Sequence, residues 1–150
     1  MPQSLSSILI HLVFSTKHRD RLISASTEPE LHAYLAAVFH ECRSPALAIG
    51  GHEDHIHALF ALSRSATVAD VVEEVKKRSS KWIKTKGVAY RDFQWQSGYG
   101  AFSVSQSKRP DLFQYIEIQE EHHRQKSYQD EFRRLCELHK VPIDERYVWD

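Results

Sequence analysis

The sequence has few of the features that mark a secreted, membrane-bound or strongly charged protein. Its two cysteines, Cys42 and Cys136, lie in predicted helices far apart and show no metal-binding spacing, so we interpret them as reduced thiols. The longest N-terminal apolar run, residues 8–14, is too short for a membrane span, and no basic segment precedes it as in a signal peptide. These absences predict a cytoplasmic protein with no membrane partner.

Net charge is also missing, because 20 Lys and Arg balance 20 Asp and Glu. A neutral total argues mildly against nucleic-acid binding, since proteins of that class usually carry net positive charge. The distribution is uneven, however, and acidic residues concentrate in the C-terminal part while basic residues crowd into two stretches. These stretches hold Lys17, His18, Arg19 and Arg21, and Lys76, Lys77, Arg78, Lys81, Lys84 and Lys86. A locally basic face on a neutral protein therefore stays open.

The 150 residues contain no repeat or low-complexity tract, and their number predicts a single domain over residues 1–150. Apolar patterning predicts strands at 7–15, 46–51 and 55–62, and aromatic, β-prone segments at 93–96 and 99–105. Helices are predicted from Thr27, with Glu30 completing a capping box, from Thr67 to about Gly87, and from 110 to about 139 with a break near Ser127.

This order of elements predicts an α+β fold: a ferredoxin-like or RRM-like antiparallel sheet with helices on one face, followed by a C-terminal helix. In such a sheet the third strand is central. The residues of the strand at 55–62 should therefore lie near the middle of the sheet.

That third strand carries two histidines within "EDHIHALF". Because side chains alternate along a strand, His55 and His57 project to one face and Ile56 to the other. Two neutral imidazoles placed in this way can bind one divalent ion and leave positions for a third ligand, water and a substrate oxygen. With ten histidines in 150 residues, roughly 0.7 such pairs are expected by chance. Histidines packed against aromatic neighbours are the alternative, and His11 and His52 are interpreted as structural and loop residues.

A second polar set lies in the predicted C-terminal helix, in "FQYIEIQEEHH". Tyr115 and Gln119 are four residues apart and so share one helical face. A tyrosine hydroxyl can act as a covalent nucleophile, and a glutamine carbonyl oxygen can bind a metal ion. The alternative is that Tyr115 covers the core beside Leu112 and Ile118 while Gln119 is solvated.

Taken together, these residues resemble the single-tyrosine HUH transposases of small bacterial insertion sequences and their REP-associated relatives. The family's His-hydrophobic-His signature is matched by His55-Ile56-His57, and its tyrosine with a glutamine four residues on is matched by "YIEIQ". The stretches "HLVFSTKHR", "WQSGYGAFSVS" and "DERYVWD" also resemble the family, in the expected order over essentially the whole chain. Ile118 replaces a common Asn, and the linker "SKRPD" before the helix lacks the glycine of some relatives, so large movement of that helix is less expected.

The resemblance implies that His55, His57 and Gln119 hold Mg²⁺ or Mn²⁺. It implies that Tyr115 cleaves and rejoins single-stranded DNA at imperfect hairpins through a 5′-phosphotyrosine. It also implies a homodimer in the bacterial cytoplasm, associated with the nucleoid when bound to DNA, with assembly of the site in cis or in trans left open.

For the hairpin phosphates we predict the basic helix as the main contact and the first basic stretch as the second. The residues concerned are Lys76, Lys77, Arg78, Lys81 and Lys84, then Lys17, Arg19 and Arg21. A solvated amphipathic helix is the alternative. Trp95 and Tyr99 are either stacking partners for unpaired bases or core aromatics.

Two further classes of function stay open. One is a catalytically silent hairpin-DNA-binding protein derived from such a transposase, although the presence of both histidines, Tyr115 and Gln119 argues against it. The other is a metal-dependent hydrolase unrelated to DNA, in which the histidines activate water. The sequence specifies neither the hairpin, the cleavage site and the metal used in the cell, nor whether the protein mobilises an element or serves its host.

Overall fold

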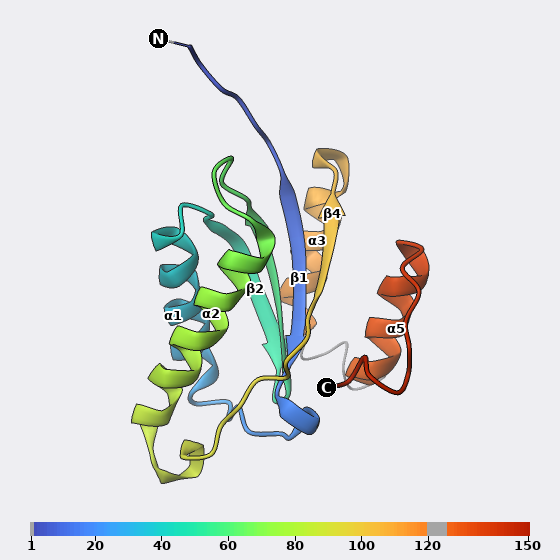
Figure 1. Ribbon diagram of the computed structural model, residues 1–150. Coiled ribbons are helices and arrows are strands. Elements are labelled where there is room, and N and C mark those ends of the chain that lie inside the picture. Colours follow the sequence, from blue (N-terminus) through green and yellow to red (C-terminus); the bar gives the residue numbers. More distant parts are fainter. Residues whose placement is uncertain (1, 120–125) are drawn as a thin grey trace.

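The computed structural model describes residues 2–119 and 126–150, in which four antiparallel strands form one sheet in the order β2-β3-β1-β4 (Figure 1). The strands are β1 (Leu9–Ser15), β2 (Ala46–His52), β3 (His55–Ala61) and β4 (Gly100–Val104). The helices are α1 (Glu28–Glu41), α2 (Val68–Ile83), α3 (Arg109–Glu117) and α5 (Tyr128–Leu138), with 3₁₀ turns at Lys17–Arg19, Lys84–Lys86, Val88–Tyr90 and Gln106–Lys108. The α+β class and the central place of β3 are confirmed.

Alternation along β1 and β3 divides the sheet into two different faces. Leu12, Phe14 and Phe60 are fully buried on the face that α1 and α2 cover, where they belong to the main hydrophobic core. The residues of these strands that alternate with the core residues, including His11 and His57, belong to the opposite face. Figure 1 shows α1 and α2 together on one side of the sheet and α3 and α5 on the other.

The start of α2 follows the sequence-based prediction and the start of α1 does not. Thr67 caps α2 by accepting a hydrogen bond from the Asp70 backbone N–H at 3.0 Å. Thr27 makes no capping bond, because its hydroxyl oxygen instead accepts a hydrogen bond from the Tyr90 hydroxyl at 2.9 Å. A long-range partner thus replaces the predicted capping box.

The α3 helix lies unusually close to the sheet, and a glycine permits it. A Cβ atom added to Gly50 of β2 would lie 2.2 Å from the backbone oxygen of Ile116, so any side chain there would collide with the helix. Ile116 itself is 1% exposed and packs with Leu9, Ala48 and Leu59. This contact positions the neighbouring Tyr115 over the sheet.

The predicted helical stretch at 110–139 contains α3 and α5 as separate helices. Ile118 leaves the helical conformation, with φ −103° and ψ 20°, so α3 ends at Glu117. Ser127 caps α5 by accepting a hydrogen bond from the Asp130 N–H at 3.2 Å, which confirms the predicted break. Apolar residues of α5 pack on Val13 and on Phe102 of β4, and a short C-terminal segment folds back over the helix.

The segment before β4 differs from its prediction. Residues 93–96 form no strand beyond an isolated bridge between Trp95 and Thr16. Trp95 is a core aromatic, because it is 8% exposed, packs edge-on against Phe14, and donates its indole N–H to Ser79 Oγ at 2.9 Å. Tyr99 remains exposed.

Two further observations concern the cysteines and the length of the helices. Both cysteines are free thiols. No helix in residues 2–119 and 126–150 is both long enough and apolar enough to cross a membrane.

Candidate metal and nucleophile site

The two histidines of β3 are fully buried and held from behind by hydrogen-bonding partners. His55 Nδ1 lies 2.7 Å from Asp54 Oδ1, and His57 Nδ1 lies 2.8 Å from His11 Nε2 on the neighbouring strand. Partners of this kind orient imidazole rings that bind metals. Both Nε2 atoms thereby face the same region above the sheet.

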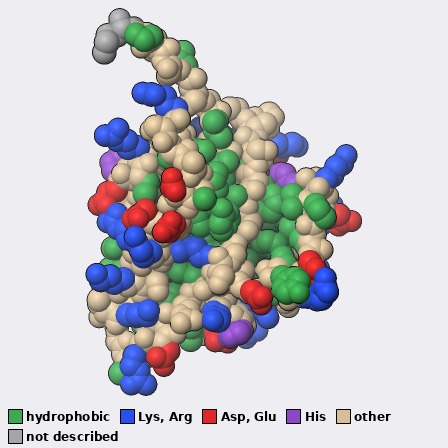
Figure 2. Space-filling model, viewed as in Figure 1, with side chains coloured by type: hydrophobic (Ala, Val, Ile, Leu, Met, Phe, Trp, Pro, Cys, Tyr) green, Lys and Arg blue, Asp and Glu red, His purple; other side chains and the backbone are tan. Residues whose placement is uncertain are grey.

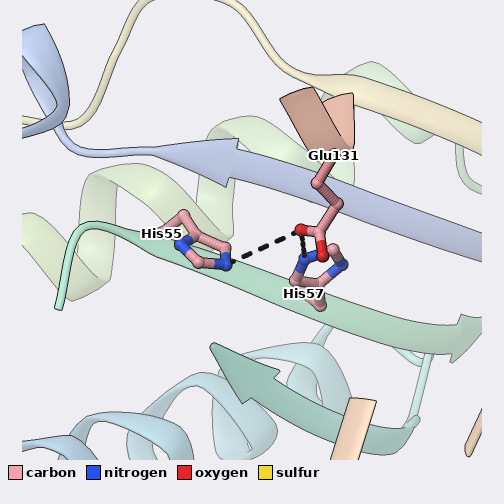
Figure 3. Close-up of side chains that lie close together, drawn as sticks. All are labelled: His55, His57 and Glu131. Atoms are coloured by element: carbon pink, nitrogen blue, oxygen red, sulfur yellow. Dashed lines mark hydrogen bonds and ion pairs between the residues drawn. The ribbon is translucent and has the colours of Figure 1, made fainter. Parts of the chain in front are cut away.

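A carboxylate from α5 reaches that region. Glu131 Oε1 lies 2.5 Å from His57 Nε2 and 3.8 Å from His55 Nε2. Figure 3 shows the side chain extending from α5 toward both imidazoles. The ligand atoms of the three residues lie within 4.8 Å of one another, and imidazole nitrogens with a carboxylate oxygen form a donor set that divalent transition metals accept. The residues present therefore fit a divalent ion.

Gln119 supplies a second oxygen to this group. Its Oε1 lies 3.4 Å from His55 Nε2, and its Nε2 donates to the backbone oxygen of Tyr115 at 3.1 Å, which orients the amide. The residue lies two positions beyond the end of α3, not within the same helix as predicted. It is only 1% exposed, so the solvated alternative is wrong.

Tyr115 is half-buried beside the imidazoles of its own chain. Its ring meets that of His57 edge-on, with 5.8 Å between centroids, and its hydroxyl donates a hydrogen bond to Glu131 Oε2. Burial and then the negative charge of Glu131 raise the pKa of this hydroxyl, and the hydrogen bond acts in the same direction. In this arrangement the phenol keeps its proton at neutral pH.

Sequence reasoning missed Glu131, although α5 contains a signal. Tyr128, Phe132 and Cys136 form the buried stripe of the helix, and Glu131 lies within that stripe at 2% exposure. A buried carboxylate costs free energy unless it is paired, so an acidic residue on an apolar face marks a candidate site. His11, interpreted as structural, is buried as well, and desolvation lowers its pKa well below the usual value.

The predicted DNA-contacting residues of α2 divide into paired and exposed cations. Lys76 donates to the backbone oxygens of residues 96, 97 and 98, at 2.5, 3.3 and 2.9 Å, and burial lowers its pKa to about 8. Lys77 pairs with Glu74 at 3.1 Å, and Arg78 with Glu41 at 2.5 Å. Lys81 and Lys84 are exposed. Of the eight predicted residues, Lys76 is thus the one most engaged in holding the fold.

The first basic stretch meets the second at Lys17. Lys17 lines the same hollow as Lys76 and Lys77, between α2 and residues 94–99. Arg19 lies over the Trp149 ring at 5.7 Å, and Arg21 lies 3.7 Å from Glu53. Figure 2 shows Lys and Arg side chains gathered on the side of the molecule formed by α1 and α2.

Comparison with known proteins places these features in a family. The chain is similar to a protein from Deinococcus radiodurans R1 whose crystal structure is provisionally described as that of a transposase: the TM-score is 0.62 and the identity 21%, over 79% of this chain and 98% of that one. It is also similar to a REP-associated tyrosine transposase bound to a REP hairpin, with a TM-score of 0.61 and 14% identity, over 82% of this chain and 72% of that one. These two likenesses establish the fold.

No curated protein matches the chain. The model of a family described as "Transposase IS200 like" matches residues 4–119, which include both histidines of β3, Tyr115 and Gln119, whereas α5 with Glu131 lies beyond the match. The match covers well over half of the sequence, and the chain belongs to the IS200-like transposase family.

Proposed function

We propose that this single domain cleaves and rejoins single-stranded DNA at hairpin-bearing ends, with Tyr115 as the nucleophile and a divalent metal ion as cofactor. The observation that supports the proposal most is a convergence of donors. Two imidazole Nε2 atoms, an amide oxygen and a phenol from separate parts of the chain meet above one point of the sheet. A protein that merely packs its histidines has no need of this arrangement.

The proposed ligands of Mg²⁺ or Mn²⁺ are His55, His57 and Gln119, and Glu131 adds a carboxylate within reach of both imidazoles. A divalent ion bound here supplies positive charge that stabilises the negative charge developing on the scissile phosphate. Asp54 and His11 hold the imidazole rings in place. The Gln119 amide is held through its bond to the α3 backbone.

In the proposed reaction the Tyr115 oxygen attacks the scissile phosphorus. The Tyr115 O–P bond forms, the bond from phosphorus to the 3′ oxygen breaks, the phenol loses its proton, and the departing 3′ oxygen gains one. A second 3′-hydroxyl can then attack the same phosphorus and release Tyr115, which regains a proton. The energy of the phosphodiester is kept in the covalent link throughout, so that rejoining needs no nucleotide cofactor.

Hairpin DNA is the proposed partner because the REP-associated relative was solved bound to a REP hairpin. Lys81 on α2 and Lys84 directly after it are the best candidates for contacts to its phosphates, since both are exposed. A homodimer and a bacterial cytoplasmic setting, with nucleoid association on DNA binding, complete the proposal. Tyr115 lies beside the histidines of its own chain, which supports assembly of the proposed site in cis.

The test is the substitution Tyr115→Phe, assayed with hairpin-bearing single-stranded DNA and Mg²⁺ or Mn²⁺. The variant keeps the ring and loses the nucleophilic oxygen, so the covalent protein–DNA adduct seen on a denaturing gel should disappear while hairpin binding persists. The control is the double variant Lys81→Ala with Lys84→Ala, which should bind hairpins more weakly and still form adduct at saturating DNA. The slope of its log affinity against log salt concentration should be lower by about 0.9 per lost phosphate contact.

Other outcomes of this assay identify the alternatives. An undiminished adduct in Tyr115→Phe would reject the nucleophile assignment. Hairpin binding without any adduct in the unmodified protein would favour a catalytically silent hairpin-DNA-binding protein. Turnover of a non-DNA substrate that persists in Tyr115→Phe would support a hydrolase.

A further inference from the structure

A cleft of about 370 Å³ separates α3 from α5, and the proposed chemistry leaves it unused. Leu112 of α3 and Leu135 and Leu138 of α5 line its sides. Tyr115 and Glu131, which are hydrogen-bonded to each other, also line it. The cleft therefore borders the nucleophilic hydroxyl, and its volume lies in the range of sites that hold small ligands.

Charged side chains line the cleft together with these apolar residues. Lys108, at the start of α3, and Arg134, on α5, are both exposed, and Lys126 and Asp111 lie with them. Arg134 lies 3.6 Å from Glu137, but both side chains are more than half exposed. Such surface pairs are weak, so Arg134 can exchange this partner for a phosphate at little cost. Apolar sides with cations beside them match the two parts of a nucleotide, its base and its phosphate.

We propose that this cleft binds a nucleotide of single-stranded DNA next to the scissile phosphate. The base lies against Leu112 and Leu138, and its phosphate faces Lys108 and Arg134. The inference deepens the proposed function and rests on it. Half of the residues that line the cleft, four of them on α5, lie beyond the residues that the family model matches, so the C-terminal part of the chain completes this nucleotide site.

A second copy of the chain is the competing occupant, because Leu138 is 60% exposed. The cations and the position of the nucleophile both favour DNA. An apolar contact between copies would gain nothing from Lys108 and Arg134, whereas a bound strand must bring its phosphate to Tyr115. The cleft lies directly beside that residue.

Photo-crosslinking of the full chain tests the site without any chemistry at Tyr115. The probe is a short oligothymidylate, too short to fold into a hairpin, that carries one 5-iododeoxyuridine, and the binding buffer contains EDTA. Mass spectrometry should find the crosslinks in the peptides around Leu112 to Tyr115 and Arg134 to Leu138. No crosslink, or crosslinks confined to other peptides, would overturn the proposal.

Two charge-altering variants sharpen the result, with affinity for the same oligothymidylate measured by fluorescence anisotropy. Leu138→Glu and Arg134→Glu should each weaken binding about ten-fold, as expected for one lost base or phosphate contact. The controls are Val88→Glu, at an exposed apolar residue elsewhere, and Arg64→Glu, at an exposed cation elsewhere, and neither should change the affinity. Thermal unfolding establishes that all four variants are folded.

The outcomes separate this inference from the proposed function. Unchanged affinity in both cleft variants, or a concentration-dependent dimer that Leu138→Glu dissociates, would overturn the nucleotide site while an adduct at Tyr115 left the chemistry intact. Crosslinks in the cleft without any adduct in the presence of metal would support the nucleotide site and reject the cleavage reaction.

Discussion

The two faces of the sheet are built from the same strands and differ in almost every physical property. On one face, apolar side chains such as Phe14 and Phe60 pack against α1 and α2, and the buried Trp95 indole N–H and Ser79 hydroxyl are hydrogen-bonded to each other. On the other, His11, His55 and His57 are equally buried, yet each has a hydrogen-bonding partner. The pleat of a strand separates neighbouring residues onto opposite faces, so one strand can stabilise the fold and hold reactive groups at once.

The comparison also explains where buried polarity is tolerated. Each imidazole on the polar face meets a carboxylate or another imidazole, and Glu131 is bonded to both His57 and Tyr115. Burying these groups without partners would cost several kcal/mol. The apolar face stabilises the molecule, and its contribution offsets the cost of assembling the site on the other face.

The largest expected effect is on the apolar face. Phe60 is fully buried and packs on Phe39 with 4.9 Å between ring centroids, so Phe60→Ala should lower the free energy of unfolding by about 3–5 kcal/mol. Urea unfolding without metal measures the loss. Tyr115→Phe, which removes one hydroxyl from the polar face, should stay within about 1 kcal/mol of the unmodified protein. Equal losses of unfolding free energy in Phe60→Ala and Tyr115→Phe would contradict the conclusion that the apolar face provides most of the stability.

A smaller effect is expected behind the imidazoles. Asp54 holds His55 through Nδ1, so Asp54→Asn should weaken Mn²⁺ binding on the order of 10–100-fold, measured by isothermal titration calorimetry. Glu53→Gln is the control, because the side chain of that neighbouring carboxylate is 46% exposed and lies 3.7 Å from Arg21. Equal Mn²⁺ affinity in the two variants would mean that Asp54 does not orient the ligand.

The smallest predicted effect concerns a histidine on the apolar side. His32 of α1 has no hydrogen-bond partner at Nε2 among the described residues, and burial lowers its pKa to about 4. Because the unfolded chain binds this proton more readily, stability is full above about pH 6.5 and falls as the pH drops toward 4. The expected loss of stability between pH 8 and pH 5 is about 1–2 kcal/mol. The loss is no larger because Glu28, 3.8 Å away, and nearby Glu117 attract the protonated ring and so offset part of the cost of burying its charge.

Urea unfolding at pH 8 and pH 5 isolates this contribution. His32→Gln should lose less stability than the unmodified protein over that interval, whereas His40→Gln, at an exposed position on the same helix, should lose as much. An identical loss in His32→Gln would assign the pH dependence to other groups, His11 foremost.

Local patterns in the sequence were sufficient for the fold, because alternation and helical periodicity act over a few residues. They predicted β3, the shared face of its two histidines and the cap at Thr67. They failed where distant residues compete, as at Thr27, whose oxygen is bonded to Tyr90. They also gave no sign that the Lys76 ammonium bonds to the carbonyls of residues 96–98. Glu131 was missed for the same reason, since only the packing of α5 on the sheet brings it to the histidines.

Gly50 of β2 influences how far Tyr115 lies from the imidazoles. Its missing side chain lets the Ile116 carbonyl come as near as 2.2 Å to where a Cβ would lie, and the tyrosine is the preceding residue. A single methyl group at that position would push the helix away from the sheet. The Tyr115 hydroxyl would then lie farther from the imidazoles, although no group of the site itself had been changed. The distance between the Tyr115 hydroxyl and the imidazoles thus depends on the absence of a side chain at Gly50, on the strand beneath the helix.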